Sequence, residues 1–427
     1  MDNYIRNNYK SLFEPSQLET LHSALLDTEI VTFSSFSKLI AAWTAFIFGD
    51  NVLLTQIMQN TLLEDLKSSQ ELSLYYGLLA LCGDIHDITP EKKLKLAHDS
   101  ETLMMDQPDD LIYGNALLTL GQVYSEKNDY PEAIRYFSRA KEVFEKSNVL
   151  FLTIIAEVNG LLNLFKLGEY HKVINGAERS IRKASCFKRT TLAPSPLFKI
   201  YDLPIGMALI ELGKYELALN HLAHCKDSID SLEMFHLHGL LEWSRMKAMR
   251  LRKDYTQLHR ALSEFRQMFI GLSSPMLQGI GDFYEIMLAY DCEKRIDHRL
   301  LERLEHLLEQ NKRSLNFILI EMMALLQLSG LKSFYKHDEV EWLETQVMNH
   351  GLIPIQQIVK RLKENLHHPL SEREREILGL LTLGESNEAI GLKLYITTGT
   401  VKWHLNNIYS KLGVKNRIQA IEKFKAL

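Results

Sequence analysis

The stretch ALLTLGQVYSEKNDYPEAIRYFSRAKEVF, residues 116–144, holds two apolar runs with helical spacing on either side of a polar turn at residues 128–130. Small residues at Gly121 and Ala133 let two helices approach, and the large ring of Phe137 fills the space between them. The polar turn ends one helix and starts the next. This stretch predicts an antiparallel helical hairpin that buries its apolar faces by stacking on similar hairpins.

The same turn recurs along the chain, each time with a residue suited to a helix end followed by a polar residue and then, in the stronger copies, a tyrosine. The stronger copies are Gly168-Glu169-Tyr170, Gly213-Lys214-Tyr215 and Lys253-Asp254-Tyr255, and the weaker ones are Gly49-Asp50-Asn51 and Gly83-Asp84-Ile85. From Tyr130 onward, the intervals between the tyrosines are 40, 45 and 40 residues. A recurring unit of this length predicts an all-α array of helical repeats over most of residues 1–350.

Residues of the opening stretch resemble the tetratricopeptide (TPR) repeat at eight positions: Leu120, Gly121, Tyr124, Tyr130, Ala133, Ile134, Phe137 and Ala140. The usual TPR period is about 34 residues. The longer intervals of this chain are similar to those of the TPR region in MalT-like regulators. This resemblance implies a superhelical sensor or interaction domain at residues 1–350.

Charge is distributed unevenly along the 427 residues. The whole chain carries −5, but residues 366–427 hold nine Lys or Arg and six Asp or Glu, a net of +3 that leaves −8 for residues 1–365. An anionic partner is therefore expected at the C-terminal end. Because the start of the chain lacks a signal-peptide pattern and the four cysteines are far apart, we expect a cytoplasmic protein that does not enter a membrane.

A boundary is predicted after the array. Gly351 and Pro354 interrupt the helical pattern, and residues 365–369 interrupt it again before a short terminal segment. We expect a linker at residues 351–369 and a four-helix module at residues 370–427. Its helices would be capped by Ser371 with Glu374, Ser386, Thr397 and Asn416, and closed by Gly384 and Gly413.

The third helix of this module has two different faces. Val401, Leu405, Ile408 and Leu412 have the spacing of one buried stripe. The opposite face carries a cation, a large aromatic residue and polar groups, at Thr398, Lys402, Trp403 and Asn406. Two short helices joined by a tight turn, with a polar outer face on the second, predict a helix-turn-helix.

The run from Leu370 to Ile421 resembles the LuxR/FixJ-type DNA-binding domain over its whole length. Matching residues include Leu370, Arg373, Glu374, Glu376, Leu378, Gly384, Ser386, Asn387, Ile390, Leu394, Thr400, Val401, Lys402, His404, Asn407, Ile408, Lys411, Leu412, Val414, Arg417 and Ala420. With the TPR-like array, the resemblance implies a bacterial transcriptional regulator that binds double-stranded DNA. One departure is that the chain lacks the G-x-x-x-x-G-K-[ST] string of the ATPase domain found in large MalT-like relatives.

The resemblance assigns base contacts to Lys402, Trp403 and Asn406, and Thr398 lies on the same outer face. Lys402 suits guanine O6 and N7, and Asn406 suits the edge of adenine. Trp403 either packs on a thymine methyl or a sugar, or shields the helix. Phosphate contacts are expected from Ser386, Asn387, Thr400, His404, Asn407 and Lys411. For His404, a structural histidine is the alternative.

The last helix carries the apolar residues Ile418, Ile421 and Phe424. In relatives of this type the helix pairs two DNA-bound modules, so the resemblance implies a homodimer on DNA, with RNA polymerase as a further expected partner. Part of this stripe must also cover the core of the module. A DNA-bound protein of this kind would be found at the nucleoid.

No catalytic motif or Gly-rich loop is present, and we expect neither enzymatic activity nor a cofactor. His221, His224 and Cys225 lie close in sequence, but their positions on a repeat helix favour packing over metal binding. By analogy with TPR grooves, an unknown small molecule, peptide or protein would contact Gln122, Phe165, Lys166, Met207, Trp243, Lys247 and Arg250. The alternative function is a TPR interaction adaptor whose helix-turn-helix mainly contacts protein.

Overall fold

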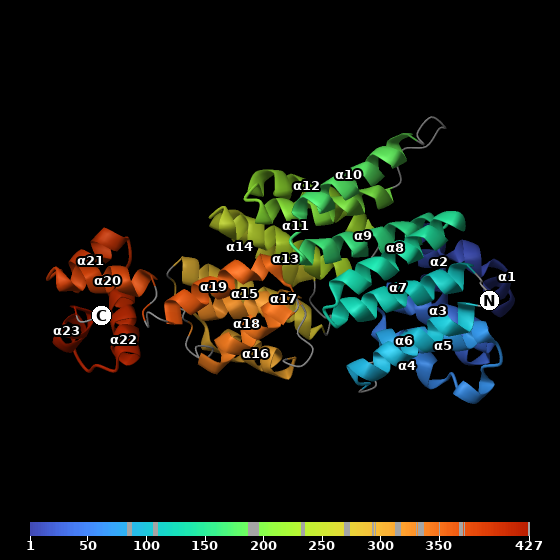
Figure 1. Ribbon diagram of the computed structural model, residues 1–427, viewed down its shortest axis with the longest axis horizontal. Helices are drawn as coiled ribbons and strands as arrows, with labels where there is room; N and C mark the ends of the chain where they lie inside the picture. Colours follow the sequence, from blue (N-terminus) through green and yellow to red (C-terminus); the bar gives the residue numbers. More distant parts are fainter. Residues whose placement is uncertain are drawn as a thin grey trace. The chain divides into compact units, whose positions relative to one another are not determined.

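The computed structural model describes residues 1–427 except 83–87, 106–109, 187–195, 232–234, 269–273, 293, 295, 312–316, 330, 332–336, 350, 367–369, 371 and 426–427. All regular secondary structure in the described part of the chain is helical, as predicted (Figure 1). Across these residues, no helix is both long enough and apolar enough to cross a bilayer. The chain divides into two compact units, Met1–Asp254 and Tyr255–Leu427.

The first unit is a series of helical hairpins. Helices adjacent in sequence pack against each other, among them α5 with α6, α7 with α8, α8 with α9 and α11 with α12 (Figure 1). Its elements are α1 (Asp2–Leu12), α2 (Pro15–Leu26), η1 (Ile30–Thr32), α3 (Ser35–Ile47), α4 (Asn51–Gln59), η2 (Leu63–Asp65), α5 (Ser69–Leu81), α6 (Pro90–Met105), α7 (Asp110–Glu126), α8 (Tyr130–Lys146), α9 (Leu150–Lys166), α10 (Tyr170–Cys186), η5 (Pro196–Tyr201), α11 (Asp202–Glu211), α12 (Tyr215–Ser231) and α13 (Phe235–Leu251).

The predicted turns share one backbone conformation. The first residue of each has a left-handed φ, +62° at Asn128, +74° at Gly168 and Gly213, and +61° at Lys253. The next residue donates its backbone N–H to the carbonyl five positions earlier, as Asp129 does to Tyr124 at 2.9 Å. This bond is typical of a Schellman helix end. The tyrosine that follows begins the next helix in all four cases, which confirms the repeat prediction.

Two further turns were predicted with weaker signals. Gly49 has φ +69°, and Asp50 donates its N–H to the carbonyl of Ala45, so this turn has the same conformation. The other turn, residues 83–85, lies outside the described residues.

Close packing of the hairpins depends on small residues opposite large ones. A Cβ on Gly121 would lie 2.6 Å from the ring of Phe137, and one on Gly206 would lie 2.6 Å from Leu222 Cγ. Since side-chain carbons cannot approach so closely, only glycine lets the paired helices reach these positions. The pattern of small and large residues in the sequence therefore describes real contacts.

The second unit contains two groups of helices. The first comprises α14 (Tyr255–Met268), α15 (Pro275–Asp291), α16 (His298–Gln310), α17 (Phe317–Leu328), α18 (His337–Asn349) and α19 (Ile353–Leu366). Asp282 on α15 is 1% exposed and accepts two 2.6 Å hydrogen bonds from Arg303 on α16, which links these two helices.

The linker expected at residues 351–369 is not borne out for residues 353–366, which form α19. Gly351 does end the preceding helix with φ +61°, but the chain enters another helix at once. The reason is an apolar stripe that the breaker residues conceal. The stripe packs α19 against α17 and α18. Its buried members are Leu352, just before α19, and Ile355, Val359 and Leu362.

Candidate nucleic-acid interface

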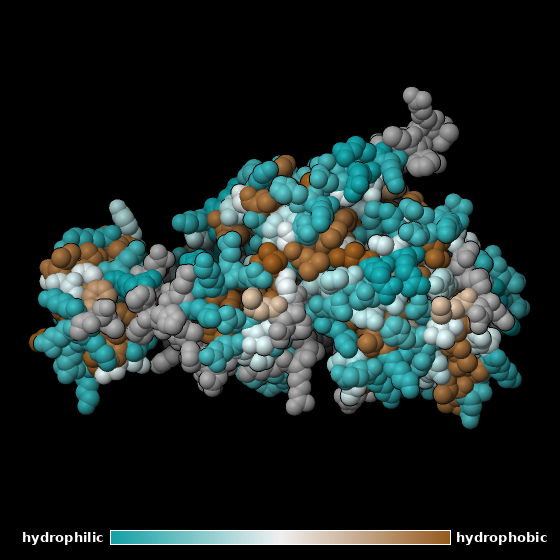
Figure 2. Space-filling view, in the orientation of Figure 1, coloured by the Kyte–Doolittle hydropathy of each residue, from teal (hydrophilic) through white to brown (hydrophobic). Residues whose placement is uncertain are grey.

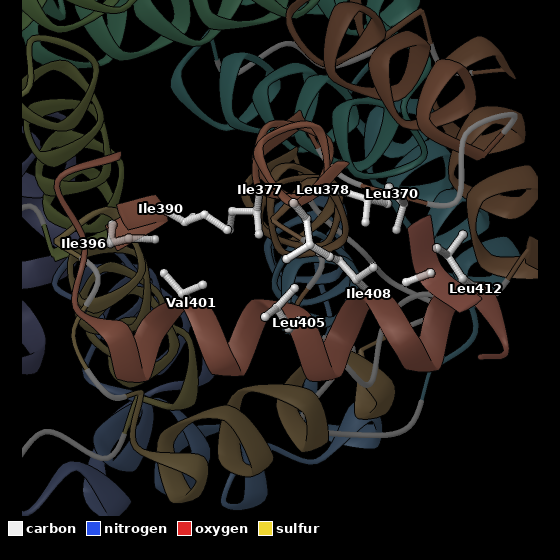
Figure 3. Packing of buried hydrophobic residues seen from close by; sticks show 11 residues of the cluster. Leu370, Ile377, Leu378, Ile390, Ile396, Val401, Leu405, Ile408 and Leu412 are labelled. Atoms are coloured by element: carbon white, nitrogen blue, oxygen red, sulfur yellow. The ribbon is translucent and has the colours of Figure 1, made fainter. Parts of the chain in front are cut away.

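The second group of helices in this unit forms a small module with its own core. Its helices are α20 (Glu372–Thr382), α21 (Asn387–Leu394), α22 (Thr398–Leu412) and α23 (Arg417–Lys425). The predicted stripe of α22 points into this core, where it meets apolar residues of α20 and α21 (Figure 3). The buried core residues are Leu370, Ile377, Leu378, Leu381, Ile390, Ile396, Val401, Leu405, Ile408, Leu412 and Ala420.

Side-chain caps set the starts of three of these helices. Ser386 Oγ accepts from the backbone N–H of Ala389, Thr397 Oγ1 accepts from Thr400, and Asn416 Oδ1 accepts from Gln419, all at 3.0 to 3.1 Å. At the opposite ends, Gly384 and Gly413 take positive φ as predicted. The cap predicted at Ser371 lies outside the described residues.

The turn between α21 and α22 is tightly constrained. Tyr395 closes α21 in the left-handed conformation. A Cβ on Gly391 would lie 2.7 Å from the carbonyl oxygen of Ile396, so the turn needs glycine there. The Arg373 guanidinium on α20 donates to the carbonyl of Leu394 at 2.6 Å and holds the end of α21. These contacts fix the angle at which α22 leaves the turn.

The outer face of α22 holds the side chains for which base contacts are expected. Thr398, Lys402 and Asn406 are exposed and follow each other at intervals of one helical turn. Within the described structure, neither Lys402 nor Asn406 makes a side-chain hydrogen bond or an ion pair. Trp403 is 45% exposed and packs edge-on against the His404 ring, with ring centroids 4.9 Å apart. This face therefore presents a cation, an amide and an indole to the surroundings.

The residues expected at phosphates fall into different environments. Ser386 is exposed, while Asn387, Thr400 and Asn407 are half-buried. Arg417 lies beside the start of α21, since its guanidinium donates to the Glu385 carbonyl at 2.6 Å and to Asn387 Oδ1 at 3.4 Å. Sequence reasoning gave Arg417 no role in the site. Its only signal was a match to the family pattern.

His404 and Lys411 are tied to the interior of the module. His404 is 8% exposed, its Nδ1 atom has no hydrogen-bond partner, and burial lowers the pKa of its imidazole to about 4. Lys411 Nζ lies 2.8 Å from Glu374 Oε2, and Glu374 is 3% exposed. Of the two roles considered for His404, this burial favours the structural one. A phosphate contact by Lys411 would compete with its ion pair.

On the last helix the three apolar residues expected at a dimer contact differ in exposure. Ile421 and Phe424 are partly buried and pack against the core of the module. Ile418 is 67% exposed. The stripe therefore serves the core at two positions and is free to meet another surface at one.

The candidate groove residues of the array are largely engaged in packing. Phe165, Met207 and Trp243 are each less than 5% exposed. Lys166 Nζ donates to Ser125 Oγ at 2.9 Å, and burial lowers the pKa of Lys166 to about 8.

Lys247 Nζ of α13 lies 2.6 Å from Glu211 Oε1 at the end of α11, and both side chains are 15% exposed. Gln122 and Arg250 are half-buried. Ligand contact by the seven residues stays a prediction.

His221 and Cys225 are occupied in the packing of α12. His221 Nδ1 lies 2.6 Å from Asp202 Oδ1 on α11. Cys225 is fully buried, and burial raises the pKa of its thiol. In the described part of the chain, no three potential metal ligands lie close enough together to hold an ion.

Comparison with known protein families identifies the terminal module. Residues 368–424 match the family described as bacterial regulatory proteins, luxR family. The C-terminal module is therefore a LuxR-type helix-turn-helix domain, in agreement with its four capped helices and with the resemblance seen in the sequence.

Individual relatives match mainly over short segments. The transcriptional regulatory protein LnrK of Bacillus subtilis (strain 168) is 57% identical over 51 residues, which are 12% of this chain and 23% of LnrK. The CsgBAC operon transcriptional regulatory protein of Escherichia coli (strain K12) is 50% identical over 52 residues, 12% of this chain and 24% of the relative.

The HTH-type transcriptional regulator MalT of Vibrio cholerae is 35% identical over 91 residues, 21% of this chain and 9% of MalT. Each match therefore covers less than a third of the relative.

One solved structure is similar over most of the chain. It is the crystal structure of a Rap protein complexed with competence and sporulation factor, with a TM-score of 0.54 over 84% of this chain and 95% of that one. Sequence identity is 13%, so the likeness concerns the fold alone. It supports the reading of the chain as a helical-repeat protein.

Proposed function

We propose that this protein is a sequence-specific transcriptional regulator that reads DNA with the outer face of α22. The observation that carries the proposal is the position of Lys402 and Asn406. Both are exposed on a helix whose opposite face is core, and neither is engaged with another described side chain. In helix-turn-helix proteins, the second helix, which follows the first helix and a tight turn, is the element that enters the major groove.

The spacing of these side chains suits two separate base contacts. Residues four apart on an α-helix are displaced along its axis by about 6 Å. One DNA strand rises about 3.4 Å per base, so Lys402 and Asn406 can reach bases roughly two steps apart. Lys402 would donate to guanine and Asn406 would pair with adenine, while Thr398 and Trp403 flank them. Ser386, the N-cap of α21, and Arg417 of α23, which lies beside it, would meet the phosphate backbone.

The remainder of the proposal concerns the array and the assembly. Stacked helical hairpins offer extended surfaces for binding partners. We propose that the array recognises a small molecule, a peptide or a protein, and that its occupancy controls whether the module binds DNA. Two copies would meet on DNA through α23 around Ile418, and RNA polymerase would be a further partner.

Selection of DNA sequences by the full-length protein tests the proposal. The wild type should enrich one motif over random duplexes. Lys402→Ala and Asn406→Ala should each weaken the free energy of binding to that motif by about 1 to 3 kcal/mol and relax the preference at one base position. Lys415→Ala is the matched control, because it removes an exposed cation of the same module outside α22.

Two outcomes would count against the proposal. If the wild type enriches no motif, the adaptor function, in which the module contacts protein, replaces it. If folded Lys402→Ala and Asn406→Ala variants keep the full preference of the wild type, the bases are read by another part of the module.

A further inference from the structure

A groove of about 640 Å³ runs along the array between α8 and α10, with α9 as its floor. Binding pockets for ligands commonly measure about 300 to 1,000 Å³, so this groove is large enough for a ligand. Its walls are α8 and α10, which are the second helices of two neighbouring hairpins. None of the residues expected to contact a ligand lines it. Figure 2 shows hydrophobic patches, in brown, among hydrophilic residues on the visible surface of the array.

The floor of the groove is apolar and open at a glycine. Ile134 of α8 and Leu161 and Leu164 of α9 line it. A Cβ on Gly160 would meet only Phe137 Cβ, at the ordinary contact distance of 3.7 Å. The backbone of α9 is therefore uncovered at this position, and space remains above it.

The rim of the groove is cationic. Four basic residues line it, Lys141 on α8 and Lys172, Arg179 and Arg182 on α10, against one acidic residue. A chain with a net charge of −5 thus places a positive surface along an apolar cleft. Charge of this kind attracts an acidic partner and disfavours a basic one.

The negative charge of the one acidic residue, Glu157, is already balanced by its own partners. It accepts hydrogen bonds from Lys141 at 2.8 Å, from Ser180 at 2.8 Å and from the hydroxyl of Tyr201 at 2.5 Å. Burial raises the pKa of the Glu157 carboxyl, but these three bonds outweigh it and leave the pKa below its usual value. Glu157 is therefore charged and fully bonded, and it does not oppose an acidic ligand.

The cations of α10 are available to a ligand. Arg179 donates its Nε to the Asn175 carbonyl at 3.2 Å and has no acidic partner within the described structure. Lys172 and Arg182 face acidic residues one turn away on well exposed positions, at 2.9 Å and 3.2 Å. Such surface pairs contribute little free energy and can be exchanged for a ligand carboxylate.

We propose that this groove binds an acidic amphipathic peptide segment, whose apolar side chains face α9 and whose carboxylates face Lys172, Arg179 and Arg182. The inference rests on the proposed sensing role of the array and specifies its ligand and the place where it binds. An apolar floor with a cationic rim fits a helix with one apolar and one acidic face. A nucleic acid would leave the apolar floor unused.

Fluorescence anisotropy with designed peptides tests the proposal on the full-length protein. The probe is a labelled helical peptide of Leu and Glu with Leu on one face. Two peptides serve as comparisons, one with Lys in place of every Glu and one with the Leu and Glu order scrambled. The amphipathic acidic peptide should bind at least roughly tenfold more tightly than either comparison, a difference of about 1.4 kcal/mol.

Variants locate the binding. Arg179→Glu should weaken the acidic peptide by tenfold or more, while Lys183→Glu, the same charge change at an exposed site on α10 outside the groove, should leave it within twofold. Gly160→Leu should fill the floor and also abolish binding. Circular dichroism of each variant tests whether it is folded. If Gly160→Leu does not fold, Arg179→Glu alone decides whether the peptide binds in the groove.

Equal binding of the three peptides, no binding of the acidic one, or equal weakening by Arg179→Glu and Lys183→Glu would overturn the groove assignment. DNA selection with the same preparations separates this result from the proposed function. Intact DNA preference without peptide binding removes only the groove assignment. Peptide binding without DNA preference removes the regulator function and leaves the groove assignment in place.

Discussion

Replacing Lys411 by methionine removes the ammonium group that faces the Glu374 carboxylate at 2.8 Å. Glu374 is 3% exposed, so the variant leaves a charged group in the interior without this cation. Breaking a buried pair by removing one partner costs about 3 to 5 kcal/mol. Because the Lys411 side chain keeps 20% exposure, we expect the lower end, about 3 kcal/mol.

Hydrogen exchange of the full-length protein, read by mass spectrometry on peptides from α20 and α22, measures this loss directly. A fall of about 3 kcal/mol in the free energy of opening should accelerate exchange of the protected amides roughly 100-fold. Lys402→Met is the matched control on the same helix, and its exposed site should change the free energy by less than about 0.5 kcal/mol. Glu374→Gln combined with Lys411→Met should recover part of the loss.

The same experiment separates two roles of Lys411. If its main role were a phosphate contact, Lys411→Met would weaken binding to all DNA sequences, flatten the salt dependence and leave exchange unchanged. Exchange rates in Lys411→Met within threefold of the wild type would refute the structural role given to the pair.

Three further predictions concern other parts of the chain. His404 has a pKa of about 4 in the folded module and 6.5 ordinarily, so on acidification the unfolded chain takes up a proton before the folded one. The free energy of unfolding, at its full value above pH 6.5, should therefore fall by roughly 1.4 kcal/mol per pH unit down to pH 4. Urea unfolding should show that His404→Gln loses this pH dependence, and an unchanged pH dependence would contradict the prediction. Gly121→Ala should destabilise the array by about 1 to 3 kcal/mol through the clash with Phe137, whereas Gly160→Ala should stabilise it by up to about 1 kcal/mol, as thermal unfolding can compare. Ile418→Glu should leave the module folded but reduce the two-copy DNA complex in gel shifts, and a complex of undiminished stoichiometry would exclude α23 as the dimer contact.

The repeats could be predicted because their turns are local. A residue with positive φ, a polar residue and a tyrosine repeat at Asn128, Gly168, Gly213 and Lys253, and each signal lies within three positions of sequence. Helices α15 to α19 lack this signature, so their pairing depends on contacts that sequence spacing does not reveal. The same limit explains the linker prediction, in which Gly351 marked a real break but said nothing about the helix that follows.

The candidate site was predictable where it depends on helix faces and not where it depends on distant partners. The periodicity of α22 places Val401 inside and Lys402 outside, and the structure agrees. Lys411 looked like a free cation because Glu374 lies 37 positions earlier in the chain. A tertiary ion pair of this kind leaves no periodic trace in the sequence.

The array shows why helix faces carried less information there. A periodic pattern assigns an inner and an outer face only to a helix that has a solvent side. Beyond Leu150 at its start, α9 has only buried residues and half-buried ones, and Asp202 to Ile210 of α11 are all buried, because each of these helices packs against several neighbours. Lys166 and Lys247 lie near the C-terminal ends of α9 and α13, the first helices of their hairpins. Each bonds to the first helix of the preceding hairpin and so joins consecutive repeats. The cations of α10, the second helix of its hairpin, remain accessible because α10 has a solvent side, and this is where the structure offers a basic groove.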